Sequence, residues 1–171
     1  MPNIEYTLTM ARYNLWQNQN LLSAASALSS SEREKDRGAF FGSIKQTFSH
    51  LFWGDQIWMS RFTDSPPPEN SITDSTDLVQ DWQEFCTARN AFDVKVLQWA
   101  HKVTPDWFDG DLSWYSGAIN RDITKPKKTL IIQFFNHQTH HRGQIHAMLT
   151  SAGQRPGDTD VPFMPEDFCN M

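Results

Sequence analysis

The chain has 171 residues, enough for one domain with a substantial hydrophobic core. Its 15 Lys and Arg stand against 20 Asp and Glu, a formal net charge of -5 with no basic patch, so direct binding to nucleic acid is not expected. No apolar run approaches the length that crosses a membrane.

The two cysteines and the start of the chain favour the cytoplasm. Cys86 and Cys169 have the spacing of neither a disulfide framework nor a zinc ribbon. Residues 1–14 lack the charged and apolar regions of a signal peptide. We therefore expect a single domain over residues 1–171, located in the cytoplasm and with reduced thiols.

The first predicted helix covers residues 4–28. Apolar side chains recur at helical spacing through Leu8, Leu15 and Leu22, and a run of serines at residues 29–31 ends the pattern. Residues 31–38 then form a charged connector.

The second predicted helix runs from about residue 43 to residue 62, with Ser43 as its N-cap. His50 lies about 100° round from Leu51, and Gly54 follows one turn later at a similar angle. A glycine beside a histidine leaves space that can hold an ion or a substrate, or that allows a close contact between helices. Spacing alone leaves both interpretations open and makes His50 a weak candidate for a metal ligand.

The third helix is predicted to start near residues 75–77, after a stiff loop with three consecutive prolines, and to end before Thr104. Its inward-facing positions alternate at spacings of four and three, the near-heptad pattern of a helix in an antiparallel bundle. These positions are Leu78, Trp82, Phe85, Arg89, Phe92, Val96, Trp99 and Val103. Cys86 lies on this helix, where packing is its expected role.

Residues 107–128 have no helical period. The segments LSWYS and RDIT lie on either side of Gly117-Ala118 and can pair as a short hairpin before the fourth helix. Residues 154–171 are rich in Pro, Asp and Gly, but they hold enough apolar side chains to lie on the bundle.

The fourth predicted helix, residues 130–153, contains four of the six histidines. Thr129 is a candidate N-cap, and Gly153 marks the end. His137 and His141 fall on one apolar stripe, four residues apart. Their imidazoles therefore lie one above the other, within reach of one ion.

Two interpretations of this histidine pair remain open. Both residues can be core histidines bonded to neighbouring side chains. Alternatively, both can bind a metal ion through one ring nitrogen while the other nitrogen contacts an acceptor. His140 lies off the stripe and is expected beside the ligands or at the surface, and His146 lies on the far side of the helix.

Together these elements predict an all-α protein, a four-helix bundle with room for a short hairpin in the long connection between the third and fourth helices. In such bundles, side chains from facing helices hold ions in the core. A third ligand from His50 would complete a three-histidine set with His137 and His141.

Three segments of the chain resemble the DinB family, also called DinB/YfiT-like. They are ARYNLWQNQNLL in the first helix, GAFFGSIKQTFSHLFWGDQIWMSRF around the second and FNHQTHHRGQIHAMLTSAG in the fourth. The ending GDTDVPFM is also similar, so the resemblance covers nearly the whole chain except its middle. It implies a four-helix bundle in which one histidine of the second helix and an HxxxH pair of the fourth bind a divalent metal. Carried over to this sequence, these ligands are His50, His137 and His141.

The resemblance also implies a class of reaction, because some members are similar to transferases in which a low-molecular-weight thiol attacks a small electrophile. Three neutral imidazoles leave the ion's charge intact and a coordination position open. We therefore expect a metal-dependent transferase or hydrolase, with thiol S-transfer favoured. Gln138 follows His137, where a zincin protease requires Glu, and the sequence identifies no general base.

A second hypothesis is a non-catalytic metal-binding module of a damage-inducible stress response, in which the ion stabilises the fold. An enzyme keeps an open coordination position, whereas a structural site is usually closed. Imidazole ligands suit zinc or nickel as the divalent ion. The family likeness and the seven Trp and twelve Phe favour a homodimer, with no nucleic acid or membrane as partner.

Overall fold

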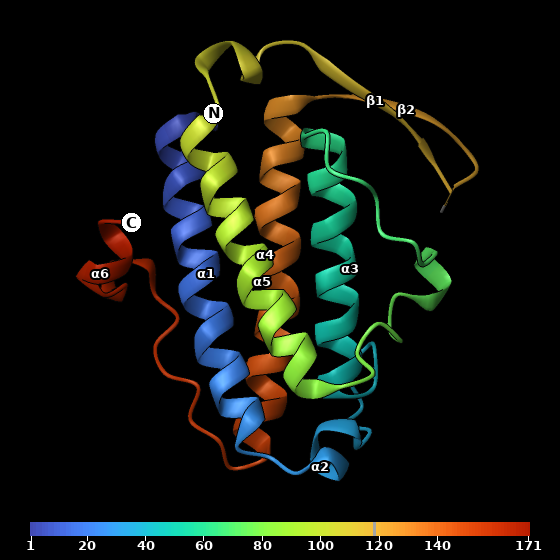
Figure 1. The fold of residues 1–171 in the computed structure, drawn as a ribbon, viewed down its shortest axis with the longest axis vertical. Coiled ribbons are helices and arrows are strands. Elements are labelled where there is room, and N and C mark those ends of the chain that lie inside the picture. Colours follow the sequence, from blue (N-terminus) through green and yellow to red (C-terminus); the bar gives the residue numbers. More distant parts are fainter. Residues whose placement is uncertain (118) are drawn as a thin grey trace.

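Four long helices stand side by side in the computed structural model, which describes residues 1–117 and 119–171 (Figure 1). They are α1 Ile4–Ser26, α3 Ile44–Phe62, α4 Trp82–Lys102 and α5 Lys127–Ser151. The predicted four-helix bundle is confirmed. Across the described residues, none of the helices is both long and apolar enough to cross a membrane.

Shorter elements lie between and after the long helices. They are α2 Ser30–Glu34, β1 Asp111–Ser116, β2 Arg121–Pro126, α6 Glu166–Cys169 and 3-10 helices at Ile72–Asp74, Pro105–Phe108 and Val161–Phe163. Strands β1 and β2 pair antiparallel, with Asp111 opposite Pro126 and Ser116 opposite Arg121. The predicted hairpin is confirmed, although Ala118 of its turn lies outside the described residues.

The ends of the helices follow local capping more closely than the apolar pattern. Ser43 caps α3 as predicted, its Oγ accepting the Gln46 backbone N–H at 3.1 Å. Helix α4 begins at Trp82 and not at residues 75–77, because Asp81 accepts the Glu84 N–H at 2.8 Å and fixes the start there.

Helix α5 also begins earlier than its sequence pattern suggests. The prediction of Thr129 as the N-cap is wrong, because β2 ends at Pro126 and the chain passes directly into the helix at Lys127. Pro126 is the N-cap, and the Lys127 N–H at the first helical position donates to the Gly110 carbonyl at 3.2 Å. At the other end, Gly153 adopts a φ of +81° and ends the helix region as predicted.

Each long helix makes its closest backbone approaches to helices that are not its neighbours in sequence. Helix α1 packs against α4 and α5, and α3 packs against α5. The last pair is the one that carries the predicted metal ligands. The tail after α5 lies on α1, since the Tyr13 hydroxyl donates to the Thr159 carbonyl at 2.6 Å.

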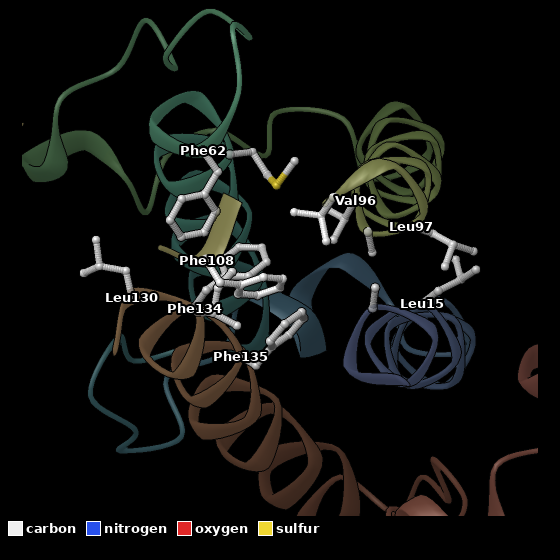
Figure 2. Close-up of a cluster of buried hydrophobic side chains, with 13 residues drawn as sticks. Leu15, Phe62, Val96, Leu97, Phe108, Leu130, Phe134 and Phe135 are labelled. Atoms are coloured by element: carbon white, nitrogen blue, oxygen red, sulfur yellow. The ribbon is translucent and has the colours of Figure 1, made fainter. Parts of the chain in front are cut away.

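Two hydrophobic clusters fill the bundle. In the first, shown in Figure 2, Phe62 of α3 meets Phe134 of α5, which in turn contacts Phe135, and α4 and α1 contribute Val96 and Leu15. The second cluster includes Leu21, Phe48, Phe85, Ile145 and Leu149. On every long helix, the residues of the two clusters are separated by buried polar positions.

These polar positions form a layer across the middle of the bundle. They are Asn14 and Asn18 of α1, Asp55 of α3, Arg89 and Asp93 of α4, and Gln138 and Arg142 of α5. Arg89 joins two carboxylates, Asp55 at 2.6 Å and Asp93. Gln138 Nε2 donates to Asp55 Oδ1 at 3.0 Å, so the layer ties α3, α4 and α5 together next to the histidines.

Candidate metal centre

Three histidines meet between α3 and α5. His50 comes from α3, and His137 and His141 come from successive turns of α5. Each offers a ring nitrogen, and these nitrogens all lie within 4.8 Å of one another. His50 and His141 are buried and His137 is half-buried. The structure therefore brings together all three residues predicted as ligands, in an arrangement that could hold a metal ion.

The three rings converge without stacking on one another. The ring centroids of His137 and His141 are 4.5 Å apart, and that of His50 lies 4.9 Å from His141 and 5.4 Å from His137. The ring planes are inclined by 56° to 76°. The rings therefore point toward a shared space from three directions.

Gly54 makes room for the ring of His137. A Cβ atom at Gly54 would lie 2.6 Å from His137 Cε1 and 3.2 Å from its Nδ1. The space predicted beside His50 is thus filled by an imidazole, so the glycine serves a close contact between α3 and α5. A side chain at this position would push His137 away from the cluster.

Hydrogen bonds orient two of the three rings. His50 Nδ1 lies 2.9 Å from Ser75 Oγ, and His141 Nδ1 lies 2.8 Å from Gln144 Oε1. Ser75 is itself fixed, because its carbonyl accepts the Ser49 hydroxyl at 2.8 Å. With Nδ1 occupied, the Nε2 lone pair of each ring is left for a ligand, the usual arrangement of metal-binding histidines.

The third ring carries an unpaired polar atom. His137 Nδ1 is buried and has no hydrogen-bond partner within the described residues. Leaving such an atom unpaired costs about 1–3 kcal/mol. A cation bound through Nδ1 would satisfy this atom, and three imidazoles are a donor set that fits a divalent metal ion.

Burial keeps the imidazoles neutral. It lowers the pKa of His50 to about 3, with a further contribution from the other two rings, and it lowers the pKa of His141 to about 4. The pKa of His137 is also lowered by burial. At neutral pH all three rings can therefore offer lone pairs to a metal without first losing a proton.

The other two histidines of α5 lie outside the cluster, as expected. His140 is exposed, and its Nε2 lies 3.2 Å from the side-chain nitrogen of Gln144. His146 Nδ1 lies 3.5 Å from the Thr150 hydroxyl. His140 thus contacts the residue that orients His141, whereas His146 contacts a residue of its own helix.

Aromatic side chains border the cluster. The ring of Phe41 stacks on His50, with centroids 4.0 Å apart and planes inclined by 29°, and its centroid lies 5.4 Å from that of His141. Phe40 meets Phe41 edge-on at 4.8 Å and is 82% exposed. We call Phe40 and Phe41 the aromatic wall. The helical pattern could not reveal it, because both residues precede α3.

Substituting Gly54 with alanine is expected to weaken metal binding about tenfold or more, because the new Cβ displaces the His137 ring and overpacking of this kind costs roughly 1–3 kcal/mol. Titration with cobalt(II), followed by its absorption spectrum, measures the change. Gly143→Ala is the control, since a Cβ there meets nothing within 4 Å. The same affinity in both variants would contradict this account of Gly54.

Ser75→Ala is expected to reduce metal affinity about ten- to hundredfold, because His50 loses the hydrogen bond that orients it. A competition titration with a chromophoric chelator measures the affinity. Ser71→Ala, in the same loop, removes a hydroxyl that bonds to Thr73 and Asp74 and should leave the affinity unchanged. A Ser75 variant with wild-type affinity would exclude an orienting role.

The chain is similar to known proteins over a range that includes all three clustered histidines. The sequence profile of the DinB family matches residues 1–167. Protein DinB of Bacillus subtilis (strain 168) is 23% identical over 168 residues, an alignment that covers 91% of this chain and 91% of that protein. The family match spans all four long helices and therefore all three clustered histidines.

Proposed function

Because this chain belongs to the DinB family, we propose that His50, His137 and His141 bind a divalent metal ion, zinc or nickel, in a metal-dependent transferase or hydrolase. Thiol S-transfer is the favoured reaction. The observation that carries the proposal is the convergence of three imidazole nitrogens within 4.8 Å of one another.

The donor set supports a catalytic role. A divalent ion held by three neutral nitrogens keeps its charge and an open position, and so supplies Lewis-acid chemistry that lowers the pKa of a bound water or thiol. Ser75 and Gln144 orient the rings of His50 and His141. His50 and His141 are buried, and the lower dielectric around them strengthens electrostatic interactions at the site.

In the proposed reaction the thiol comes from solution. Cys86 is packed in the second hydrophobic cluster, where burial raises the pKa of its thiol. The Cys169 thiol donates to the Met164 carbonyl at 3.5 Å.

The sulfur of the added thiol forms a bond to the electrophilic atom, the leaving group departs with its electron pair, and the thiol proton passes to the leaving group or to solvent.

Metal content and thiol binding test the proposal in sequence. Elemental analysis of the purified protein is expected to find about one zinc or nickel ion per chain. The cobalt(II)-loaded protein is then titrated with 2-mercaptoethanol, whose binding should change the visible spectrum. With monobromobimane as electrophile, thiol alkylation faster than in buffer should require the metal.

A non-catalytic metal-binding module of a stress response is the second candidate. It is favoured by the stacking of Phe41 on His50, which covers one face of a proposed ligand. A protein that binds cobalt but shows no spectral change with thiol and no metal-dependent alkylation would support this candidate. Absence of metal after reconstitution would exclude both.

A homodimer is part of the same proposal. It is supported by the likeness to the family and by the aromatic content of seven Trp and twelve Phe. Sedimentation at micromolar protein concentration tests it. A species with the 19.8 kDa mass of one chain would contradict it.

A further inference from the structure

The aromatic wall stands on a tight turn formed by residues 36–43. Gly38 and Gly42 have φ values of +71° and +72°, which side-chain-bearing residues rarely adopt. The Gly42 N–H donates to the Ala39 carbonyl at 2.8 Å, and the Arg37 N–H donates to the Gly42 carbonyl at 2.9 Å. Backbone hydrogen bonds therefore hold the part of the chain from which the two rings project.

The turn is also anchored to the elements on either side. The Arg37 guanidinium pairs with Glu32 of α2 at 2.6 Å, and Ser43 at the other end is the N-cap of α3. His50 follows on that helix. The rings and the first proposed ligand are thus held by one continuous and well-bonded segment, so their relative placement is preorganised.

Phe41 is the innermost residue of this wall. It contacts His50 face to face and lies against His141, so it touches two of the three proposed ligands. A molecule that reached the cluster from this side would contact the Phe41 ring. The ring is only half-buried, so part of it remains open to a ligand.

Phe40 extends the apolar surface outward. It packs edge-on against Phe41, and 82% of it is exposed. Covering such a ring is favourable, and aromatic rings gain further from stacked or edge-on contacts with other planar groups. Anionic or strongly hydrated groups would lose solvation against these two rings without a polar partner in return.

We propose that Phe40 and Phe41 form the binding wall for a planar apolar group, aromatic or unsaturated, of the substrate that reaches the metal. The inference rests on the proposed function, since it places this group beside the ion's open position. The stacking of Phe41 on His50 favours a small-molecule occupant over a second protein chain, because the wall leads directly to the ligand cluster.

Three hydroxamates test the proposal on the cobalt(II)-loaded protein. Acetohydroxamate, cyclohexanecarbohydroxamate and benzohydroxamate present the same two oxygens to a metal and differ only in the attached group. Dissociation constants are read from the visible spectrum of cobalt. Benzohydroxamate is expected to bind about tenfold more tightly than acetohydroxamate and more tightly than the saturated ring.

Variants of the aromatic wall test whether Phe41 causes the preference for benzohydroxamate. In Phe41→Ala the affinities for benzohydroxamate and acetohydroxamate should lie within about twofold of one another. Phe41→Leu should keep the apolar contact but lose the preference for benzohydroxamate over cyclohexanecarbohydroxamate. Phe163→Ala removes a ring that is 63% exposed on the tail and should change nothing.

The outcomes separate this inference from the proposed function. Cobalt binding with equal affinity for all three hydroxamates, or a preference that survives Phe41→Ala, would overturn the inference and leave the metal site intact. Cobalt binding without binding of any hydroxamate would also overturn it, and would indicate a closed structural site. Failure to bind cobalt would overturn the metal site itself and the inference with it.

Discussion

Alanine in place of His50, His137 or His141 is expected to abolish stoichiometric metal binding. The proposed site has three protein ligands, and the removal of one leaves two imidazoles on a partly hydrated ion, so the affinity should fall by more than about 100-fold. Elemental analysis after exhaustive dialysis measures the loss. His140→Ala and His146→Ala should retain the metal, because neither residue belongs to the cluster.

Thermal unfolding gives an independent measure of the same loss. An ion that binds only the folded protein stabilises it by about 2.7 kcal/mol when its free concentration is 100 times the dissociation constant. Added zinc should therefore raise the melting temperature of the wild type and of the two control variants, and leave the three ligand variants unchanged. Equal metal content and equal shifts in all five variants would show that the ligand assignment is wrong.

Replacement of Arg89 by methionine is expected to lower the free energy of unfolding by about 3–5 kcal/mol. Arg89 is 1% exposed and pairs with Asp55 and Asp93, which are both fully buried. Without the guanidinium, two carboxylates remain in the core with too few partners. Urea denaturation measures the change. Arg155→Met, at an exposed position, should stay within about 0.5 kcal/mol of the wild type.

The pH dependence of the Arg89 defect provides a further check. Burial raises the pKa of Asp93 to about 6, and Arg89 opposes this rise. Loss of Arg89 raises the pKa further, so the folded variant binds more protons than the unfolded chain and loses stability as the pH rises. The defect should therefore be smaller at pH 5 than at pH 7.

Combining Arg89→Met with Asp55→Asn and Asp93→Asn should recover part of the stability, and a triple variant as unstable as the single one would argue against unpaired charge as the cause.

The periodic pattern of the sequence predicted which side chains lie close together on the same helix. His137 and His141 are four residues apart on α5, and their proximity follows from helix geometry alone. His50 lies on another helix, so spacing could not place it beside them, and its choice required the family resemblance. Ser75 lies in a loop, where no periodicity indicates that its hydroxyl reaches His50.

The buried charges show a similar limit. Arg89 occupies a position of the near-heptad seam of α4, which correctly indicates that it faces inward. The pattern does not reveal its partners, because Asp55 comes from α3 and their contact depends on how the helices pack. Local structure explains the helix starts. The capping bond of Asp81 starts α4 after Leu78, and α5 follows directly on the end of β2 at Pro126, before Thr129.

The pairing of the helices has a consequence for how the chain folds. The closest backbone approaches join α1 to α4 and α5, and α3 to α5, so they connect helices that are not consecutive in sequence. Between the consecutive helices α3 and α4, contacts are made by side chains, such as the Arg89–Asp55 ion pair. Long segments must be closed before packing stabilises them, and the entropy of closing such loops slows folding. We expect folding slower than that of a bundle built from consecutive helical hairpins. During synthesis, α3 must also wait for the C-terminal helix α5 before its main partner exists.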